Sequence, residues 1–401
     1  KAFLIFTQSF GMNYILFDGP NREALLPFTY TRPVADIRIG ILTIREKWEL
    51  FLGATTTTIT EDYLSDKFPM VEMEENIMIN SSYLPSNELV SQIKNLSNNQ
   101  VIYDGDTIVA FYNLEDQEVD FDVFETMQCE DSILKVETTW DIFSKNAAAI
   151  IADFELITAG RSSAQIPERT EAFNTDQIFI EEGAQLPSCI LNATNGPIYI
   201  GKNTEIMEGS LVRGPFALCE GSILKMGAKI YGPTTIGPYS KVGGEVNNSV
   251  FFGNSNKAHE GFLGNSVIGE WCNLGADTNN SNLKNNYAEV RLWSYETENF
   301  AKTGLQFCGL MMGDHSKCGI NTMFNTGTVI GVSANIFGSG FPRNFIPSFS
   351  WGGAKGFTTN LTAKAFEVAT EVMSRRGLEF SAQESAILEQ VFEQTSVYRK
   401  D

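Results

Sequence analysis

Residues 200–242, "IGKNTEIMEGSLVRGPFALCEGSILKMGAKIYGPTTIGPYSKV", place an aliphatic side chain at every sixth position. These positions are Ile200, Ile206, Val212, Leu218, Leu224, Ile230, Ile236 and Val242. The period differs from the periods of a helix and of an ordinary strand, which are about 3.6 and 2 residues. It predicts short strands joined by turns, three to each triangular coil, with the aliphatic side chains stacked inside the coils.

The same pattern continues further along the chain in two blocks. One block is Phe262, Ile268 and Leu274, and the other is Met312, Cys318, Phe324, Ile330 and Ile336. We therefore predict a parallel β-helix over residues 177–351, with all of these side chains in its core. The stretch between the two blocks is expected to protrude from the prism as a loop, and loops on rigid scaffolds often carry function.

The segments on either side of the repeat have other patterns. Residues 12–160 alternate short apolar runs, such as "NYILFDG", with segments of helical spacing, such as "GILTIREKWELFLG", which predicts an α/β domain. The polar residues 161–176 are expected to be a linker. Residues 352–401 show helical spacing twice, with the capping-box signal "SAQE", so two helices are expected to cap the open end of the β-helix. Residues 1–11 hold a short apolar patch without a clear cleavage site, and we interpret them as an extension of the chain rather than a signal peptide.

The composition argues against several classes of function. A formal net charge of −20 disfavours nucleic acid and anionic membranes as partners, because their phosphates would be repelled. Small phosphorylated ligands stay possible through a local cluster of donors. No apolar run reaches the ~18 residues of a membrane span. The six cysteines include no CxxC pair, which disfavours a disulfide framework or a thiolate metal site and favours the cytoplasm.

Residues 258–282, "AHEGFLGNSVIGEWCNLGADTNNSN", contain His259, one of only two histidines in the chain. A three-histidine zinc centre of the carbonic anhydrase kind is therefore disfavoured, and no metal site is expected in the repeat. His259 could be a packed or solvated side chain on a flat face, or it could be a catalytic base. Histidine in general suits proton removal at neutral pH, because the ordinary pKa of an imidazole is near 6.5. The segment resembles the acetyltransferase domain of the bacterial bifunctional N-acetylglucosamine-1-phosphate uridyltransferase/glucosamine-1-phosphate N-acetyltransferase family, which favours the catalytic interpretation.

The resemblance implies a fold and a set of roles. It implies a left-handed coil, His259 as the catalytic base, and Asn273 and Asn282 at the acceptor-sugar site. Acyl-CoA contacts are expected in the later coils, around Ile320 and Gly338. The resemblance also implies a homotrimer, with each site between neighbouring prisms.

The sequence departs from the family pattern at the acceptor site. Phe262 stands where the family has a sugar-contacting tyrosine, and Asn247 stands where it has a phosphate-binding lysine. The cations that could replace this lysine are Lys257, Lys284, Arg291 and Arg213. His315, in "MGDHSKCGIN", either contacts substrate across a subunit interface or caps a turn.

The front domain carries a second resemblance. Residues 16–40, "LFDGPNREALLPFTYTRPVADIRIG", resemble the opening of sugar nucleotidyltransferases, which implies that Gly19, Arg22 and Arg32 bind the phosphates of UTP in the presence of Mg²⁺. Where that family has a metal-binding carboxylate, this chain has a pair of serines, Ser81-Ser82. Asp104 and Asp106, which follow in the sequence, either supply the missing metal-binding carboxylate or belong to a surface turn.

Together the two resemblances predict an alternative form of the bifunctional enzyme of UDP-N-acetylglucosamine synthesis. Acetyl-CoA would acetylate glucosamine 1-phosphate in the β-helix, and the front domain would transfer a uridylyl group from UTP. Two alternatives stay open. The front domain could be a non-catalytic sensor of nucleotide sugars, or the β-helix could be a trimeric scaffold that binds no acyl-CoA.

Overall fold

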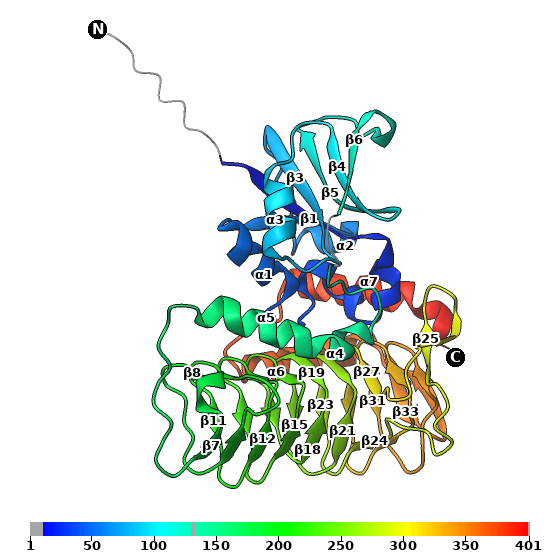
Figure 1. Ribbon diagram of the computed structural model, residues 1–401. Helices are drawn as coiled ribbons and strands as arrows, with labels where there is room; N and C mark the ends of the chain where they lie inside the picture. The colour runs from blue at the N-terminus through cyan, green and yellow to red at the C-terminus, as the bar shows by residue number, and fades with distance from the viewer. Residues whose placement is uncertain (1–10, 130–132, 400–401) are drawn as a thin grey trace.

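The computed structural model describes residues 11–129 and 133–399, so nearly all of the extension that precedes Met12 lies outside the described residues. The described part of the chain forms a front α/β domain, a left-handed parallel β-helix and two C-terminal helices (Figure 1). No helix in the described residues is long and apolar enough to cross a membrane.

The front domain is built on a six-stranded mixed sheet in the order β2-β1-β3-β5-β4-β6. Its strands are β1 (Asn13–Phe17), β2 (Thr56–Ile59), β3 (Glu75–Asn80), β4 (Gln100–Asp104), β5 (Thr107–Leu114) and β6 (Glu125–Gln128). Its helices are α1 (Ile44–Leu52), α2 (Asp62–Ser65), α3 (Asn87–Lys94), α4 (Asp141–Ser144) and α5 (Asn146–Thr158). The short 3-10 helices of the described residues are η1 (Pro20–Leu25), η2 (Phe28–Tyr30), η3 (Val34–Asp36), η4 (Phe121–Val123), η5 (Thr175–Gln177) and η6 (Ser396–Tyr398).

The repeat forms a three-sided prism, as the six-residue period predicts. Sheet 1 contains β8 (Ile178–Ile180), β10 (Ile198–Ile200), β13 (Phe216–Leu218), β16 (Thr234–Ile236), β19 (Val250–Gly253), β22 (Val267–Glu270), β27 (Leu310–Met312), β30 (Thr328–Ile330) and β32 (Phe345–Ile346). Sheet 2 contains β11 (Glu205–Ile206), β14 (Ile223–Leu224), β17 (Lys241–Val242), β20 (Asn256–Lys257), β23 (Asn273–Leu274), β28 (Lys317–Cys318), β31 (Asn335–Ile336), β33 (Ser350–Gly353) and β34 (Gly356–Thr359). Sheet 3 contains β7 (Glu171–Phe173), β9 (Ile190–Asn192), β12 (Leu211–Arg213), β15 (Lys229–Tyr231), β18 (Glu245–Asn247) and β21 (Phe262–Gly264), and β24 (Asn279–Asn280) and β29 (Met323–Phe324) follow on the same side.

The predicted core ladder lies inside the prism, with one correction. Ile200, Leu218 and Ile236 stack in neighbouring coils, and all three are fully buried. Phe262, in contrast, faces outward, and the buried position in β21 belongs to Leu263, which pairs with Val246. The prediction failed here because the inward positions Leu263 and Ile268 are only five residues apart, so counting back six residues from Ile268 reaches Phe262 instead of Leu263.

The prism extends slightly beyond the predicted range at both ends. Strand β7 lies within the segment interpreted as a linker and pairs with β9, and the hairpin of β33 and β34 continues past Trp351. The two predicted C-terminal helices are present as α6 (Thr362–Ser374) and α7 (Ala382–Gln394), and α7 begins at the predicted capping box of Ser381 and Glu384.

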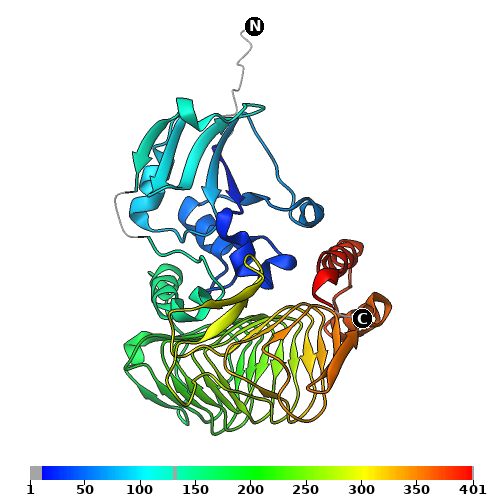
Figure 2. The ribbon, with the colours of Figure 1, turned by 90° about the vertical axis from the view of Figure 1, so that its right-hand side faces the viewer.

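The C-terminal helices do not cap the open end of the prism. They turn back along it, and α7 packs between the prism and the front domain (Figures 1 and 2). The reason is apolar burial, because Ile387, Leu388 and Val391 of α7 join the hydrophobic core of the front domain.

The outer side of sheet 1 is covered by the front domain. Val250, Phe252 and Val267, which point out of the prism, are buried in the same core as the front-domain residues, and the rings of Phe28 and Phe252 lie 5.1 Å apart. The predicted loop between β24 and β27 is also packed against this core. It contains the hairpin of β25 (Arg291–Ser294) and β26 (Asn299–Lys302), and Tyr295 at its tip contacts Tyr30 with a ring separation of 5.5 Å.

Candidate active site and the domain junction

His259 lies in the turn that joins sheet 2 to sheet 3, between β20 and β21, and its side chain is exposed. The turn is held by the next coil, where the Asp277 N–H donates a hydrogen bond of 2.9 Å to the Glu260 carbonyl. Gly261 has a φ of +120°, and a Cβ at this position would stand 2.1 Å from the Thr278 carbonyl oxygen. Only glycine therefore fits this position, and the backbone conformation of the His259 turn is closely constrained.

Lys257 precedes this turn and points into the prism. It pairs with Val242 of β17, occupies an aliphatic position of the core ladder and is only 2% exposed. Its Nζ donates hydrogen bonds to the carbonyl oxygens of Gly243 at 2.8 Å and His259 at 2.9 Å. Burial lowers the pKa of Lys257 to about 8. Because Lys257 points into the prism, it cannot bind a phosphate outside it. Its hydrogen bonds instead stabilise the His259 turn from inside the prism.

The two predicted acceptor-site asparagines lie at different places on the prism. Asn273 is exposed on sheet 2, one coil above Asn256. Asn282 follows β24 at the corner between sheets 3 and 1, where its amide donates a 2.8 Å hydrogen bond to Asn265. Among the described residues, no hydrogen bond joins His259 to either asparagine. His259 and Asn282 therefore stand at opposite edges of sheet 3 within one chain.

The cations proposed to replace the missing lysine are dispersed. Asn247 of β18 lies on sheet 3 beside Gly264, and Arg213 is exposed on the same sheet in an earlier coil. Lys284 and Arg291 lie in the loop that leaves the corner after β24. A further cation on sheet 3, Lys229, was missed by the sequence analysis, because only the strand register shows which side chains share a face.

The two residues assigned to acyl-CoA lie on the same corner as His259. The Asn321 N–H donates a 2.8 Å hydrogen bond to the Ala276 carbonyl, so the turn of Ile320 stacks above the coil that covers the His259 turn. Ile320 is 70% exposed. Gly338, in the following turn, has a φ of +100° and open space where a side chain would be. This corner is thus a continuous exposed edge that begins at His259.

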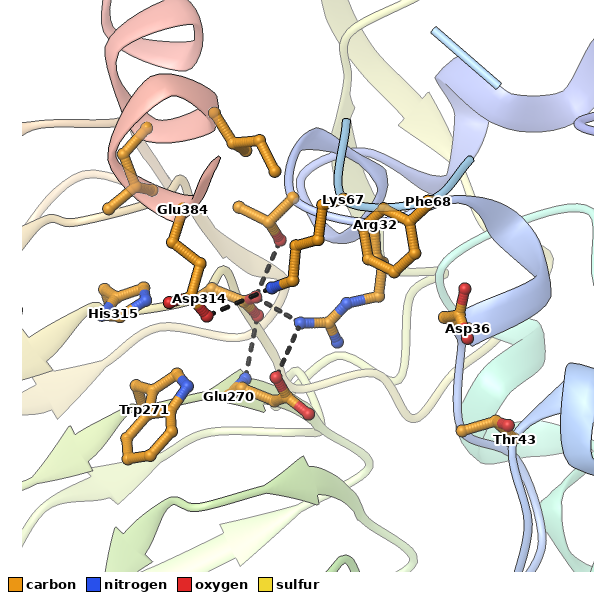
Figure 3. Close-up of a pocket in the computed structure, with 13 residues that line it drawn as sticks. Arg32, Asp36, Thr43, Lys67, Phe68, Glu270, Trp271, Asp314, His315 and Glu384 are labelled. Carbon is orange, nitrogen blue, oxygen red and sulfur yellow. Dashed lines mark hydrogen bonds and ion pairs between the residues drawn. The ribbon is translucent and has the colours of Figure 1, made fainter. Parts of the chain in front are cut away.

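A second polar cluster lies where the front domain, the prism and α7 meet. Arg32, which is 5% exposed, forms an ion pair with Asp314 and another of 3.4 Å with Glu270, both in the prism. Lys67 pairs with Glu384 of α7 at 3.2 Å. These side chains converge around a cavity of about 230 Å³ (Figure 3). Arg32 therefore joins the front domain to the prism, and its assigned role in phosphate binding stays a prediction.

His315 lines the same cavity. Its ring stacks on Trp271 with a centroid separation of 6.3 Å, and Phe380 meets it edge-on. Burial holds the pKa of His315 well below its usual range, so the ring is neutral at physiological pH. The residue has a φ of +59°, and its N–H donates to the Glu270 carbonyl at 2.8 Å. His315 therefore occupies a turn at the domain junction, and its contact with substrate stays a prediction.

In the front-domain loop that resembles a phosphate-binding turn, the charged side chains already form hydrogen bonds within the loop. The Asp18 carboxylate accepts hydrogen bonds from the Val34 N–H at 2.7 Å and from Arg22 at 3.1 Å. Arg22 also donates to the Thr29 carbonyl at 2.6 Å. A Cβ on Gly19 would stand 2.5 Å from the side chain of Asn80, so this glycine allows close packing of the loop on β3.

The residues present do not fit the expected Mg²⁺ site. Ser81 and Ser82 are buried, and neither hydroxyl has a hydrogen-bond partner among the described residues. Asp104 is engaged by Lys135 at 3.1 Å and by the Tyr83 hydroxyl. Among residues 11–129 and 133–399, no group of three or more His, Cys, Asp or Glu side chains could hold a metal ion. Mg²⁺ prefers carboxylate oxygens, which are absent where the family would supply them.

Comparison with known proteins gives partial matches to this chain. Residues 14–162 match the sugar nucleotidyl transferase family. The bifunctional protein GlmU of Methanocaldococcus jannaschii is 34% identical over 89 residues, which cover 22% of this chain and 21% of that protein. The match thus spans about one fifth of the length of this relative.

Solved structures that resemble this chain at low sequence identity include two acyltransferases. A UDP-N-acetylglucosamine acyltransferase from Francisella novicida is 14% identical, with a TM-score of 0.27, and the match covers 57% of this chain and 78% of the other. An Arabidopsis UDP-N-acetylglucosamine acyltransferase is 16% identical, with a TM-score of 0.26, and the match covers 59% and 82%.

Proposed function

We propose that this protein transfers the acetyl group of acetyl-CoA to the amino group of a sugar phosphate, with glucosamine 1-phosphate as the expected acceptor. The observation that carries the proposal is the exposure of His259 in a turn that Gly261 and the next coil hold in place. The exposed corner that continues from His259 to Ile320 supports an extended donor along the prism.

The chemistry requires a base at this position. The acceptor amine attacks the thioester carbonyl carbon through its lone pair, and a C–N bond forms. The imidazole of His259 takes the proton that the nitrogen loses. The tetrahedral intermediate collapses as the C–S bond breaks, and the CoA thiolate leaves and is protonated. A backbone N–H of a coil turn is the simplest donor to the oxyanion. Proton transfer by such a base typically contributes about 10²–10⁴-fold to the rate.

We further propose that the active assembly is a homotrimer. Two features support it. His259 and Asn282 stand at opposite edges of sheet 3, so one chain alone does not enclose an acceptor. The outer side of sheet 1 is covered by the front domain and part of sheet 2 by α6, which leaves sheet 3 and the rest of sheet 2 for neighbouring prisms.

For the front domain, the observed contacts favour the alternative of nucleotide-sugar binding without turnover over uridylyl transfer from UTP. The arginine of the loop is engaged by Asp18 and Thr29, and the buried Ser81-Ser82 pair offers no carboxylate for Mg²⁺. No catalytic step is therefore assigned to this domain.

The experiment is a panel of sugar phosphates incubated with acetyl-CoA and analysed by product mass. The proposal expects one added acetyl group on glucosamine 1-phosphate. Failure to bind or consume any acyl-CoA would favour the scaffold alternative. A pyrophosphate-release assay with UTP, beside calorimetry with UTP and UDP-sugars, tests the front domain separately. Binding without release of pyrophosphate is the expected result.

A further inference from the structure

The inserted hairpin of β25 and β26 forms an open groove with the last coils of the prism. Figure 2 shows this hairpin, in yellow, rising from the prism toward the front domain. The groove has a volume of about 650 Å³. Its described lining, which we call the hairpin groove, is Lys284, Arg291, Trp293, Phe300, Thr326, Arg343, Asn344 and Phe345.

The charge of the hairpin groove is opposite to that of the whole chain. Three of its lining residues are cationic and none is acidic, although the chain has a formal net charge of −20. Within the described part of the chain, none of the three cations forms an ion pair. The nearby carboxylate of Glu289 is engaged by the Gly304 N–H at 2.6 Å and by Lys302 at 3.7 Å. Lys284 donates a 2.9 Å hydrogen bond to the Glu289 carbonyl, whereas neither Arg291 nor Arg343 has an ion-pair partner within the described residues.

The wall of the groove is aromatic. Trp293 stacks on Phe345 with a centroid separation of 4.2 Å and an interplanar angle of 9°. Phe300 packs edge-on against Trp293 at 5.6 Å, across the two strands of the hairpin. The indole N–H of Trp293 has no acceptor within the described residues. Such a wall offers flat apolar surface directly beside the cations.

We propose that the hairpin groove is a binding site for a nucleoside phosphate. Guanidinium groups form bidentate hydrogen bonds with phosphate oxygens, which suits Arg291 and Arg343. Aromatic side chains accept a base by stacking. A simple anion would use only the cations, and an uncharged apolar ligand would use only the wall. This site goes beyond the proposed acetyl transfer and does not depend on His259.

The test is calorimetry of the full chain with UDP, ADP, uridine and inorganic pyrophosphate, followed by Trp fluorescence. The double variant R291Q/R343Q removes both guanidinium groups, and both residues are exposed, so the fold is expected to persist. The matched control is K302Q, which removes a cation that pairs with Glu289 and does not line the groove.

The proposal expects UDP or ADP to bind the wild-type protein at least about tenfold more tightly than the double variant, with K302Q close to wild type. Uridine and pyrophosphate should each bind more weakly than the nucleotide. Nucleotide binding that is absent, or equal in R291Q/R343Q, overturns the site. Pyrophosphate that binds as tightly as UDP overturns the aromatic part of the proposal. The variant H259A, which should bind UDP normally, separates failure of acetyl transfer from failure of this site.

Discussion

The Nζ of Lys257 donates a 2.9 Å hydrogen bond to the main-chain carbonyl of His259, from inside the prism. The same ammonium group holds the Gly243 carbonyl of the preceding coil. A buried lysine thus connects two successive turns, one of which carries the proposed catalytic base.

The first prediction concerns this connection. The variant K257M keeps the length and apolar character that the core ladder requires but removes both hydrogen bonds. We expect kcat for acetyl transfer to fall about 10- to 100-fold, because small displacements of a catalytic group have effects of that size, while KM changes little. The control is K241M, which removes an exposed lysine from the neighbouring strand of sheet 2. Equal kcat values for K257M and K241M would show that the lysine only fills space.

The second prediction concerns pH and stability. Burial lowers the pKa of Lys257 to about 8 in the folded protein, whereas in the unfolded chain it has the ordinary value near 10.5. Between these two pH values the unfolded chain binds more protons, so the free energy of unfolding rises with pH. Relative to K257M, the wild-type protein should gain up to about 1.4 kcal/mol per pH unit in this window. Urea unfolding of both proteins at several pH values measures the difference, and parallel stability curves would contradict the expectation.

The third prediction concerns the domain junction. In the variant R32M, the buried Asp314 carboxylate loses its cation and keeps only hydrogen bonds such as that from the Thr31 hydroxyl at 2.7 Å. Loss of one partner of a buried pair costs about 3–5 kcal/mol. The matched control is R161M, whose ion pair with Glu181 is partly exposed and is expected to be worth at most about 1 kcal/mol. Thermal unfolding measures both variants, and equal losses would rule out a special role for the junction pair.

The fourth prediction tests whether the site is shared between subunits. H259A and N282A are each expected to be inactive as homotrimers. If His259 of one subunit works with Asn282 of its neighbour, random mixed trimers should regain about one quarter of the sites, as expected for a head-to-tail ring. Co-expression followed by an acetyl-transfer assay measures the recovery. A mixture that stays inactive would place both residues of a site in the same chain.

The architecture could be predicted because it follows from local patterns. The period of residues 200–242 required a coil with an aliphatic interior, and the "SAQE" signal marked the start of α7. The error at Phe262 has a local cause. A turn that is one residue shorter moves the inward position from Phe262 to Leu263, and both residues are apolar, so the sequence alone does not distinguish them. Lys257 was misinterpreted because a lysine normally marks a surface, although it occupies a core position of the repeat.

The contacts between distant segments could not be predicted. Arg32 and Asp314 are 282 positions apart, and nothing in either local sequence indicates the other. The position of α7 depends on which apolar face is available to cover Ile387, Leu388 and Val391, and that face exists only in the folded front domain. Lys229 was missed for the same reason, because neighbouring positions in a sheet are set by register.

The most direct test of the central claim is steady-state acetyl transfer by the variant H259Q, with acetyl-CoA binding measured in parallel by calorimetry. Glutamine keeps a polar side chain at the turn but cannot accept the proton of the amine. We expect kcat to fall about 10²–10⁴-fold, with acetyl-CoA affinity close to that of the wild-type protein. An H259Q protein with the full kcat of the wild type would contradict the assignment of His259 as the base.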